Sequence, residues 1–172
     1  MEIQGDGFIL RKLRESDATS LQKHADNPHI ADFLFDRFPC PYSLQDAEDF
    51  IALCMADEAD TRFAIVIDDE VTGMVGIEMR FDIYRKSPLI GYWLSELHWG
   101  KGITSKAVKL VVAYGFAQLD IVRIQAGVLD NNPRSMRVLE KAGFTKEAVL
   151  KNAIIKKDVI LDEHLYAILK GD

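Results

Sequence analysis

The sequence predicts a mixed α/β fold made of strand hairpins and a few amphipathic helices. Short runs rich in β-branched and aromatic residues alternate with longer segments of helical periodicity. The chain has 172 residues and 48% hydrophobic residues, which is enough for one sizeable core. Because no repeat, low-complexity tract or Pro/Gly/Ser-rich linker divides the sequence, we expect a single domain over residues 1–172.

The first half of the chain contains clear local signals. "FILRKL" (8–13) alternates and predicts a strand, and "SDATSLQKHAD" predicts a short helix with Ser16 as its N-cap. The segment 33–42 carries aromatic residues and prolines and predicts a loop. Ser43 and Asp46 have the spacing of a capping box, which predicts the start of a helix.

The second half begins with a predicted hairpin over 62–68 and 71–81, in which Glu78 shares the more polar face of its strand. "PLIGYWLS" is apolar on both faces and predicts a central strand. The remaining predicted elements are a helix over 104–118, a strand over 121–129, a short helix ending at Gly143 and a last strand over 158–170.

Charge, cysteine content and hydropathy exclude several classes of function. The formal net charge of −6 lacks the basic footprint of a nucleic-acid-binding protein. No apolar run approaches about 18 residues and the N-terminus lacks a secretion-signal layout, so we expect no membrane association. Cys40 and Cys54 show no close pairing, which favours reduced thiols in a cytoplasmic protein. The four histidines have no metal-ligand spacing, so we expect no metal.

The stretch "WGKGITS" has the composition of an anion-binding loop at a helix start. Gly100 and Gly102 would let an anion approach the unpaired N–H groups of the helix, with Lys101 and Thr104 nearby. The alternative is a plain tight turn before a capped helix. A P-loop has a different spacing, and a dinucleotide fold would need a third glycine where Ser105 stands.

Two motifs together resemble the GNAT superfamily of acetyl-coenzyme A (acetyl-CoA)-dependent N-acetyltransferases. These are "IGYWLSELHWGKGITSKAV" and, about 30 residues later, "DNNPRSMRVLEKAGF". The openings "FILRKLRESDA" and "YSLQDAEDFI" are similar to the branch of ribosomal-protein-alanine acetyltransferases, so the resemblance covers nearly the whole chain. It implies one GNAT domain with a mostly antiparallel central sheet and helices on both of its faces.

The resemblance also implies a binding site for acetyl-CoA. Its diphosphate would lie on main-chain N–H groups of the glycine loop, and its pantetheine arm would lie along a strand as an added strand does. Leu97 departs from the family pattern, which has Gln or Arg there. The alternative for Asn132 is a helix N-cap, and that for Trp93 is packing. The implied cofactor-binding residues are Trp93, Leu94, Gly100, Lys101, Gly102, Ile103, Thr104 and Asn132.

The candidate catalytic residues are Ser135, Glu78 and Glu96. Ser135 matches the family serine that would assist the leaving thiolate, while the tyrosine of many members is absent, with Val138, Leu139 and Glu140 in that region. Glu78 and Glu96 are candidates for the general base, acting through water. Each carboxylate has an equal alternative as an ordinary solvated side chain.

The acceptor implied by the resemblance is a protein or peptide N-terminal amine. A small amine (polyamine, amino acid or aminoglycoside) is the nearest alternative, and a non-catalytic CoA-binding module is a third. We expect the aromatic loop 33–42 to select the acceptor. The sequence leaves a homodimer open.

Overall fold

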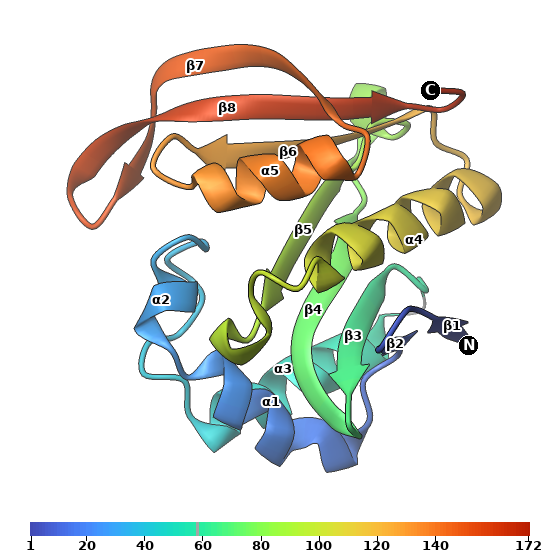
Figure 1. The fold of residues 1–172 in the computed structure, drawn as a ribbon, viewed down its shortest axis with the longest axis vertical. Helices are drawn as coiled ribbons and strands as arrows, with labels where there is room; N and C mark the ends of the chain where they lie inside the picture. Colours follow the sequence, from blue (N-terminus) through green and yellow to red (C-terminus); the bar gives the residue numbers. More distant parts are fainter. Residues whose placement is uncertain (58) are drawn as a thin grey trace. The chain divides into compact units, whose positions relative to one another are not determined.

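The computed structural model describes residues 1–57 and 59–172, and the chain divides into two compact units. The first unit comprises residues 1–76 and 92–107, and the second comprises residues 77–91 and 108–172. The fold is mixed α/β with mostly antiparallel strand pairing, as the sequence predicts (Figure 1).

The strands of the first unit pair in chain order. They are β1 (Glu2–Gln4), β2 (Ile9–Arg11), β3 (Arg62–Ile67) and β4 (Glu70–Glu78). Each is antiparallel to the next, with Leu10 opposite Ile65 between β2 and β3. Asp68 and Asp69 form the β3–β4 turn with φ of 50° and 64°, which suits a two-residue hairpin. The hairpin was predicted, whereas β1 was not, because three residues are too few to show an alternating pattern.

The helical segments of the first unit are η1 (Glu15–Asp17), α1 (Ala18–Ala25), α2 (Pro28–Ala31) and α3 (Leu44–Ala56). The predicted capping box is confirmed, since the Asp46 N–H donates to Ser43 Oγ and the Ser43 N–H donates to Asp46 Oδ2. The predicted N-cap role of Ser16 is wrong. Ser16 lies inside η1, a 3-10 turn closed by the Asp17 carboxylate, which accepts the Arg14 N–H at 2.8 Å.

The main core cluster of the first unit combines residues of helices α1 and α3 with residues of strands β3 and β4. Helices α1 and α3 contact each other, and the half-buried side chains of Phe38 and Trp93 pack against this core. Its buried members are Leu13, Leu21, Ala25, Tyr42, Ala47, Ile51, Ala64, Val66, Val71 and Met74.

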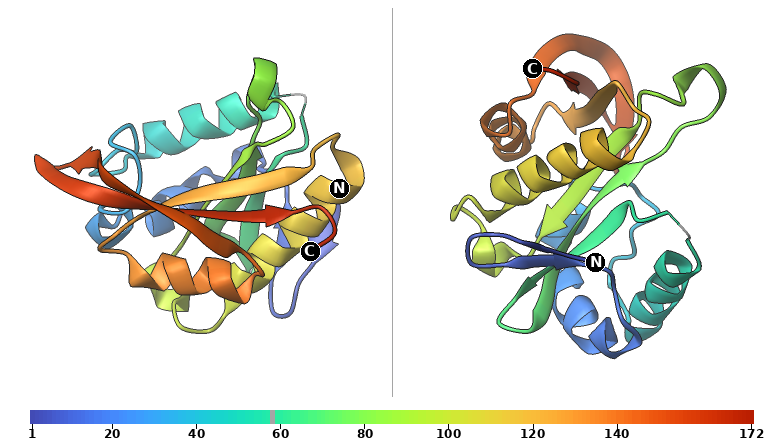
Figure 2. Two further views of the ribbon diagram at one scale, coloured as in Figure 1. Left: turned by 90° about the horizontal axis from the view of Figure 1, so that it is seen from above. Right: turned by 90° about the vertical axis from the view of Figure 1, so that its right-hand side faces the viewer.

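The second unit contains a long hairpin that the sequence did not reveal in full. The hairpin consists of β7 (Thr145–Lys156) and β8 (Val159–Leu169). Strand β6 (Arg123–Leu129) pairs with β8, which gives the order β6-β8-β7, and helix α5 (Pro133–Lys141) lies between β6 and β7 in the chain. β8 matches the predicted last strand. β7 was missed, because its residues are mostly exposed and show no apolar alternation. Figures 1 and 2 show it running beside β8.

Strand β5 (Leu89–Leu94), 3-10 turns η2 (Asp82–Tyr84) and η3 (Glu96–His98), and helix α4 (Ile103–Gln118) complete the described elements. The strand predicted over 71–81 ends at Glu78, and Phe81 lies beyond it with 85% of its surface exposed. β5 is parallel to β6, and among the described residues their register is Leu89 opposite Gln125. The Gln125 N–H donates to the Pro88 carbonyl at this point.

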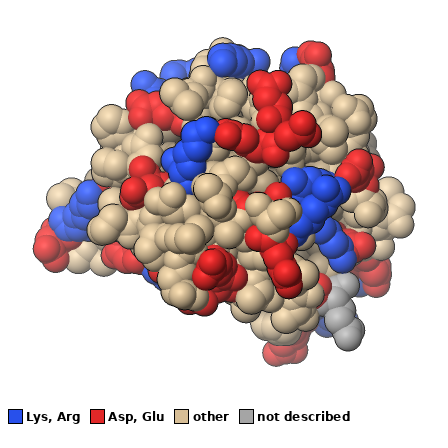
Figure 3. Space-filling view, turned by 90° about the horizontal axis from the view of Figure 1, so that it is seen from below, with Lys and Arg blue, Asp and Glu red and all other residues tan. Residues whose placement is uncertain are grey.

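Acidic and basic side chains alternate over the face drawn in Figure 3. No helix in the described part of the chain combines the length and the apolar character that a membrane span requires.

Candidate functional site

The glycine loop lies in the first unit directly before helix α4. Gly100 and Gly102 are in the left-handed conformation, with φ of 77° and 76°. Side chains are strained at such angles, so glycine permits this turn. The Lys106 N–H donates to the Gly102 carbonyl at 3.2 Å, which joins the loop to the helix that begins at Ile103. The N–H groups of the first helical turn have no intrahelical acceptor, and the helix dipole favours an anion there.

The surroundings of this loop are open. A Cβ built on Gly100 or Gly102 would meet no atom within 4 Å, so backbone conformation rather than crowding selects glycine here. Lys101 is exposed, Thr104 is half-buried, and the Ile103 side chain is buried and anchors the helix start. An anion can therefore approach the main chain of the loop from solvent.

Trp93 and Leu94 lie at the end of β5 in the first unit. The Trp93 ring contacts the Phe38 ring edge-on, with 6.1 Å between centroids, so the aromatic loop 33–42 reaches this strand. The Leu94 carbonyl accepts a hydrogen bond from Trp99 Nε1 at 2.8 Å. The indole of Trp99 thus fixes the strand end relative to the glycine loop, and one lone pair of that carbonyl is already used.

Ser95, the residue after β5, is a buried anchor that the sequence did not indicate. Its N–H donates to the Thr72 carbonyl at 2.7 Å, and its Oγ lies 2.9 Å from His24 Nδ1. The other ring nitrogen of His24 lies 2.8 Å from Glu70 Oε2, and hydrogen bonds from Lys23 and then His24 lower the pKa of Glu70. Helix α1, β4 and the chain that leads into the glycine loop are joined here.

Glu96 follows Ser95 and holds a second hydrogen-bonded cluster. Asn27 Nδ2 donates to Glu96 Oε2 at 2.8 Å. His29 Nδ1 lies 3.0 Å from Oε2 and 3.2 Å from Oε1 of the same carboxylate. Glu96, one of the two candidate bases, is therefore an exposed but organised group, bonded to the start of helix α2.

The second unit contains the other predicted residues. Asn132 is the N-cap of α5, because its Oδ1 accepts the Ser135 N–H at 3.2 Å, so the capping role is observed. Ser135 is half-buried in the first turn of α5, and Leu139 is fully buried one turn later, near where many family members have a tyrosine. Glu78 is exposed at the end of β4.

The structure groups the predicted residues by unit. Trp93, Leu94, Glu96 and the loop 100–104 belong to the first unit, and Glu78, Asn132 and Ser135 belong to the second. Sequence reasoning missed the partners of Ser95 and Glu96, because these partners lie 67 to 71 residues away in the chain and no local pattern pairs them.

Two further features of the described residues lie apart from these groups. A polar cavity of about 450 Å³ in the first unit is lined by Arg11, Arg14, Asp17, Lys23 and Glu70 among others, and no predicted site residue lines it. The described residues contain no group of three or more His, Cys, Asp or Glu side chains arranged to hold a metal ion.

Comparison with known proteins identifies the family. Residues 8–145 match the family model described as "Acetyltransferase (GNAT) domain". The chain is 44% identical over 108 residues to "Probable N-acetyltransferase YjcK" of Bacillus subtilis (strain 168), a match covering 61% of this chain and 58% of that protein. It is 33% identical over 105 residues to "Ribosomal-protein-serine acetyltransferase" of Escherichia coli (strain K12), covering 61% of this chain and 58% of that protein.

Solved structures share the fold. The ribosomal L7/L12 alpha-N-protein acetyltransferase RimL, solved in complex with coenzyme A, superimposes with a TM-score of 0.85 at 21% identity, covering 98% of each chain. The family model spans well over half of this sequence and includes β5, the glycine loop, α4 and α5. The chain therefore belongs to the GNAT family of N-acetyltransferases.

Proposed function

We propose that the protein transfers the acetyl group of acetyl-CoA to the N-terminal amine of a protein or peptide by direct attack, with no covalent enzyme intermediate. The observation that carries the proposal is the pair of left-handed glycines, Gly100 and Gly102, immediately before the 16-residue helix α4. The similarity to a ribosomal-protein-serine acetyltransferase, together with the fold shared with RimL, supports a protein acceptor.

The glycine loop fits the diphosphate of the cosubstrate. The N–H groups of residues 100–104 can donate to phosphate oxygens without a Cβ in the way at either glycine, and the exposed Lys101 adds positive charge. β5 pairs with β6 at Leu89 opposite Gln125, at the start of β5. The pantetheine arm is proposed to lie farther along β5, at Trp93 and Leu94, where main-chain groups would bind it as they bind an added strand.

An N-terminal acceptor makes a modest demand on the base. With ordinary pKa values, roughly one α-amine in seven is neutral at pH 7, compared with roughly one lysine side chain in 2,500. A weak, solvent-connected base is then sufficient. Glu78 and Glu96 are the proposed candidates. The contacts of Glu96 with Asn27 and His29 favour it over Glu78, either as the base or as the carboxylate partner of a base.

Ser135 is proposed to assist the departing thiolate, and Asn132 to contact the pantetheine arm. A thiolate with a pKa of about 8.5 needs only a hydrogen bond or a proton passed through water. A serine hydroxyl can donate that hydrogen bond. The main-chain N–H of Ser135 donates to Asn132 Oδ1.

The experiment is thiol release from acetyl-CoA against a panel of amines. The panel contains peptides with free N-termini, the same peptides with blocked N-termini, a polyamine, an amino acid and an aminoglycoside. Release that requires a free peptide N-terminus is the expected result, and release with a small amine alone would reassign the acceptor. Binding of acetyl-CoA without acceptor-dependent release would indicate a non-catalytic binding module.

A Ser135→Ala variant tests the thiolate role without disturbing the helix cap. We expect turnover to fall while acetyl-CoA binding, measured by calorimetry, is retained. Full turnover in this variant would remove the role proposed for Ser135.

The whole chain, residues 1–172, is proposed to act as one catalytic domain, because β4, β5 and α4 each run from one unit into the other. Unpaired Cys40 and Cys54 support a cytoplasmic location. A homodimer stays a prediction, which light scattering would test.

A further inference from the structure

We infer that His29 accepts the proton of the attacking amine, and that Glu96 and Asn27 act as its positioning residues. This inference rests on the proposed function and deepens it, because it assigns the base of the same reaction. All three residues belong to the first unit, and Glu96 stands between the end of β5 and the glycine loop.

The hydrogen bonds among Asn27, His29 and Glu96 determine how the Asn27 amide is oriented and which ring nitrogen of His29 carries the proton. The His29 N–H donates to Asn27 Oδ1 at 2.9 Å, so the amide of Asn27 has its oxygen toward the helix and its Nδ2 toward Glu96. A carboxylate only accepts hydrogen bonds. Since Glu96 accepts from Asn27 and faces His29 Nδ1 with both oxygens, Nδ1 must carry the proton.

This tautomer leaves a basic nitrogen for chemistry. When Nδ1 of a neutral imidazole is protonated, Nε2 has the lone pair and accepts a proton. The carboxylate then stabilises the imidazolium that forms, as a carboxylate partner does in other histidine bases. Histidine is the side chain that most often serves as a general base in enzymes.

Access favours His29 over His24, the other histidine of the first unit that has a carboxylate partner. The His29 side chain is 64% exposed, so a peptide amine can reach it and the proton can leave to solvent. The His24 side chain is 4% exposed, and its two ring nitrogens face Ser95 and Glu70. His24 therefore serves the fold, whereas His29 faces solvent.

The proposed step balances in atoms and charge. The amine nitrogen forms a bond to the thioester carbonyl carbon, the carbon–sulfur bond breaks, and CoA leaves as a thiolate. The proton lost by the amine goes to His29 Nε2 and then to solvent, while the thiolate takes a proton from solvent. The products are the amide and free CoA thiol.

Variants of the three residues, assayed with the peptide panel, test the assignment. His29→Gln should lower kcat about 100-fold, the lower end of the range for general-base catalysis, with the KM for acetyl-CoA changed less than about twofold. Added imidazole should restore part of the rate. Glu96→Gln and Asn27→Ala should each lower kcat by less, because Nε2 remains but its tautomer is no longer held. Glu48→Gln, an exposed carboxylate on α3, is the matched control and should behave as the parent protein.

The pH profile of kcat separates a base from a structural residue. The charged group in contact with His29 is Glu96 on η3, and Asp26 and Asp32 lie three residues away on either side in the chain. His29→Gln should lack the one-proton acid limb that a general base gives to the profile of the parent protein.

Two results would overturn the assignment. One is a His29→Gln variant with unchanged kcat and an unchanged pH profile. The other is a larger loss in Glu96→Gln than in His29→Gln, which would make Glu96 itself the base. Failure of the parent protein to release thiol with any amine, despite binding acetyl-CoA, would instead overturn the proposed function and this inference with it.

Discussion

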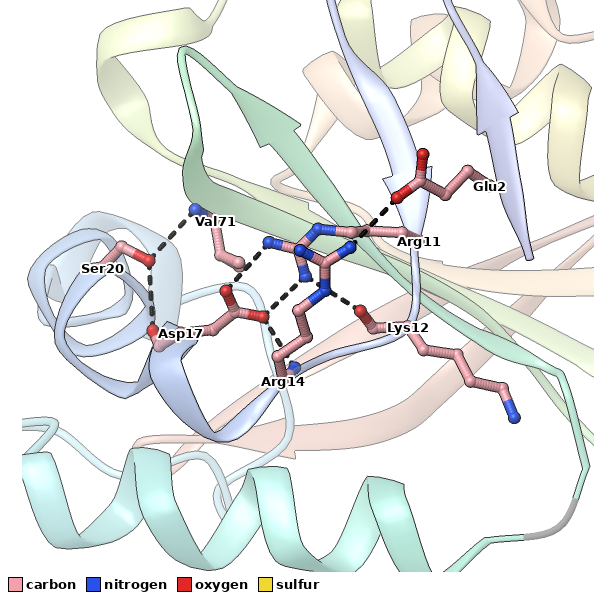
Figure 4. Close-up of polar contacts among 7 residues, drawn as sticks. All are labelled: Glu2, Arg11, Lys12, Arg14, Asp17, Ser20 and Val71. Carbon is pink, nitrogen blue, oxygen red and sulfur yellow. Dashed lines mark hydrogen bonds and ion pairs between the residues drawn. The ribbon is translucent and has the colours of Figure 1, made fainter.

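We expect the Asp17→Asn substitution to destabilise the protein strongly. Asp17 accepts hydrogen bonds from Arg11 Nη1 at 2.7 Å and Nη2 at 2.9 Å, and a third from the Arg14 N–H at 2.8 Å (Figure 4). The side chains of Arg11 and Asp17 are only 9% and 6% exposed. Asparagine has a similar shape but presents an amide donor and no charge, so the Arg11 guanidinium would stay buried without a counter-ion.

The size of the effect follows from this geometry. Removing one partner of a buried ion pair costs about 3–5 kcal/mol. Both side chains line the cavity of about 450 Å³, where water can reach part of the guanidinium, so we expect the lower end, about 3 kcal/mol. With a urea m-value of about 2 kcal/mol per molar, the unfolding midpoint would fall by about 1.5 M. Far-UV circular dichroism during a urea titration measures this shift.

Two controls separate the ion pair from other effects. Asp120→Asn removes one partner of the exposed Lys86–Asp120 pair and should leave the midpoint unchanged within error. The Arg11→Met/Asp17→Leu double variant removes both charges and should lose less stability than the two single variants summed. A midpoint for Asp17→Asn within about 0.3 M of the parent protein would refute the reasoning.

The same pair gives a pH dependence of known sign. Burial alone raises the pKa of Asp17, but the hydrogen bonds from Arg11 and the Arg14 N–H, with their charges, outweigh it and bring the pKa below its ordinary value of 3.8. Because the folded-state pKa is the lower one, the contribution is complete above about pH 5 and is lost as the pH falls through the folded-state pKa. Acidification should therefore cost Asp17→Asn less stability than it costs the parent protein.

The remaining predictions concern the glycines and the α5 cap. Gly102→Ala should weaken CoA binding about tenfold by calorimetry, because a left-handed alanine is strained by about 1–2 kcal/mol, whereas Gly171→Ala, also at positive φ, should bind normally. Gly73→Ala should lower stability and raise the KM for acetyl-CoA, because its Cβ would lie within 2.5 Å of the Trp93 carbonyl oxygen; an unchanged KM would argue against a binding role for β5. Asn132→Ala should lower the free energy of unfolding by about 1 kcal/mol, because the helix cap is lost, whereas Asn132→Ser keeps a capping side chain. Weaker CoA binding by the serine variant would therefore indicate a contact between Asn132 and the ligand, and normal binding would exclude one.

Features set by neighbouring residues could be predicted from the sequence. The Ser43–Asp46 capping box, the β3–β4 hairpin and the glycine turn before α4 each depend on a few consecutive side chains whose conformational preferences are strong. The hairpin turn was expected at Asp69 and Glu70 and lies one residue earlier, at Asp68 and Asp69. The family resemblance added the assignment of that turn to a diphosphate, which its local geometry fits.

Features set by tertiary contacts could not be predicted. Asn27, His29 and Glu96 meet across 67 to 69 residues of chain, and each of them alone is an ordinary polar residue. Ser16 was assigned as an N-cap on its type, but the neighbouring Asp17 carboxylate is drawn to the buried Arg11, and this tightens the turn into a 3-10 helix. Contacts between distant residues formed the first cluster, and at Ser16 they outweighed the local preference for an N-cap.

The position of strand β7 affects the tendency of the protein to aggregate at high concentration. It ends the strand order, so the outer edge of a 12-residue strand is a template on which another chain could grow a fibril-like ladder. Val149, Leu150 and Ile155 on this strand are 37%, 41% and 64% exposed, which would favour such growth. Lys146, Lys151 and Lys156 interrupt the apolar residues at five-residue intervals, and an incoming strand would have to dehydrate these ammonium groups. The lysines therefore act as gatekeepers against aggregation, and chemical neutralisation of all three should make concentrated samples turbid.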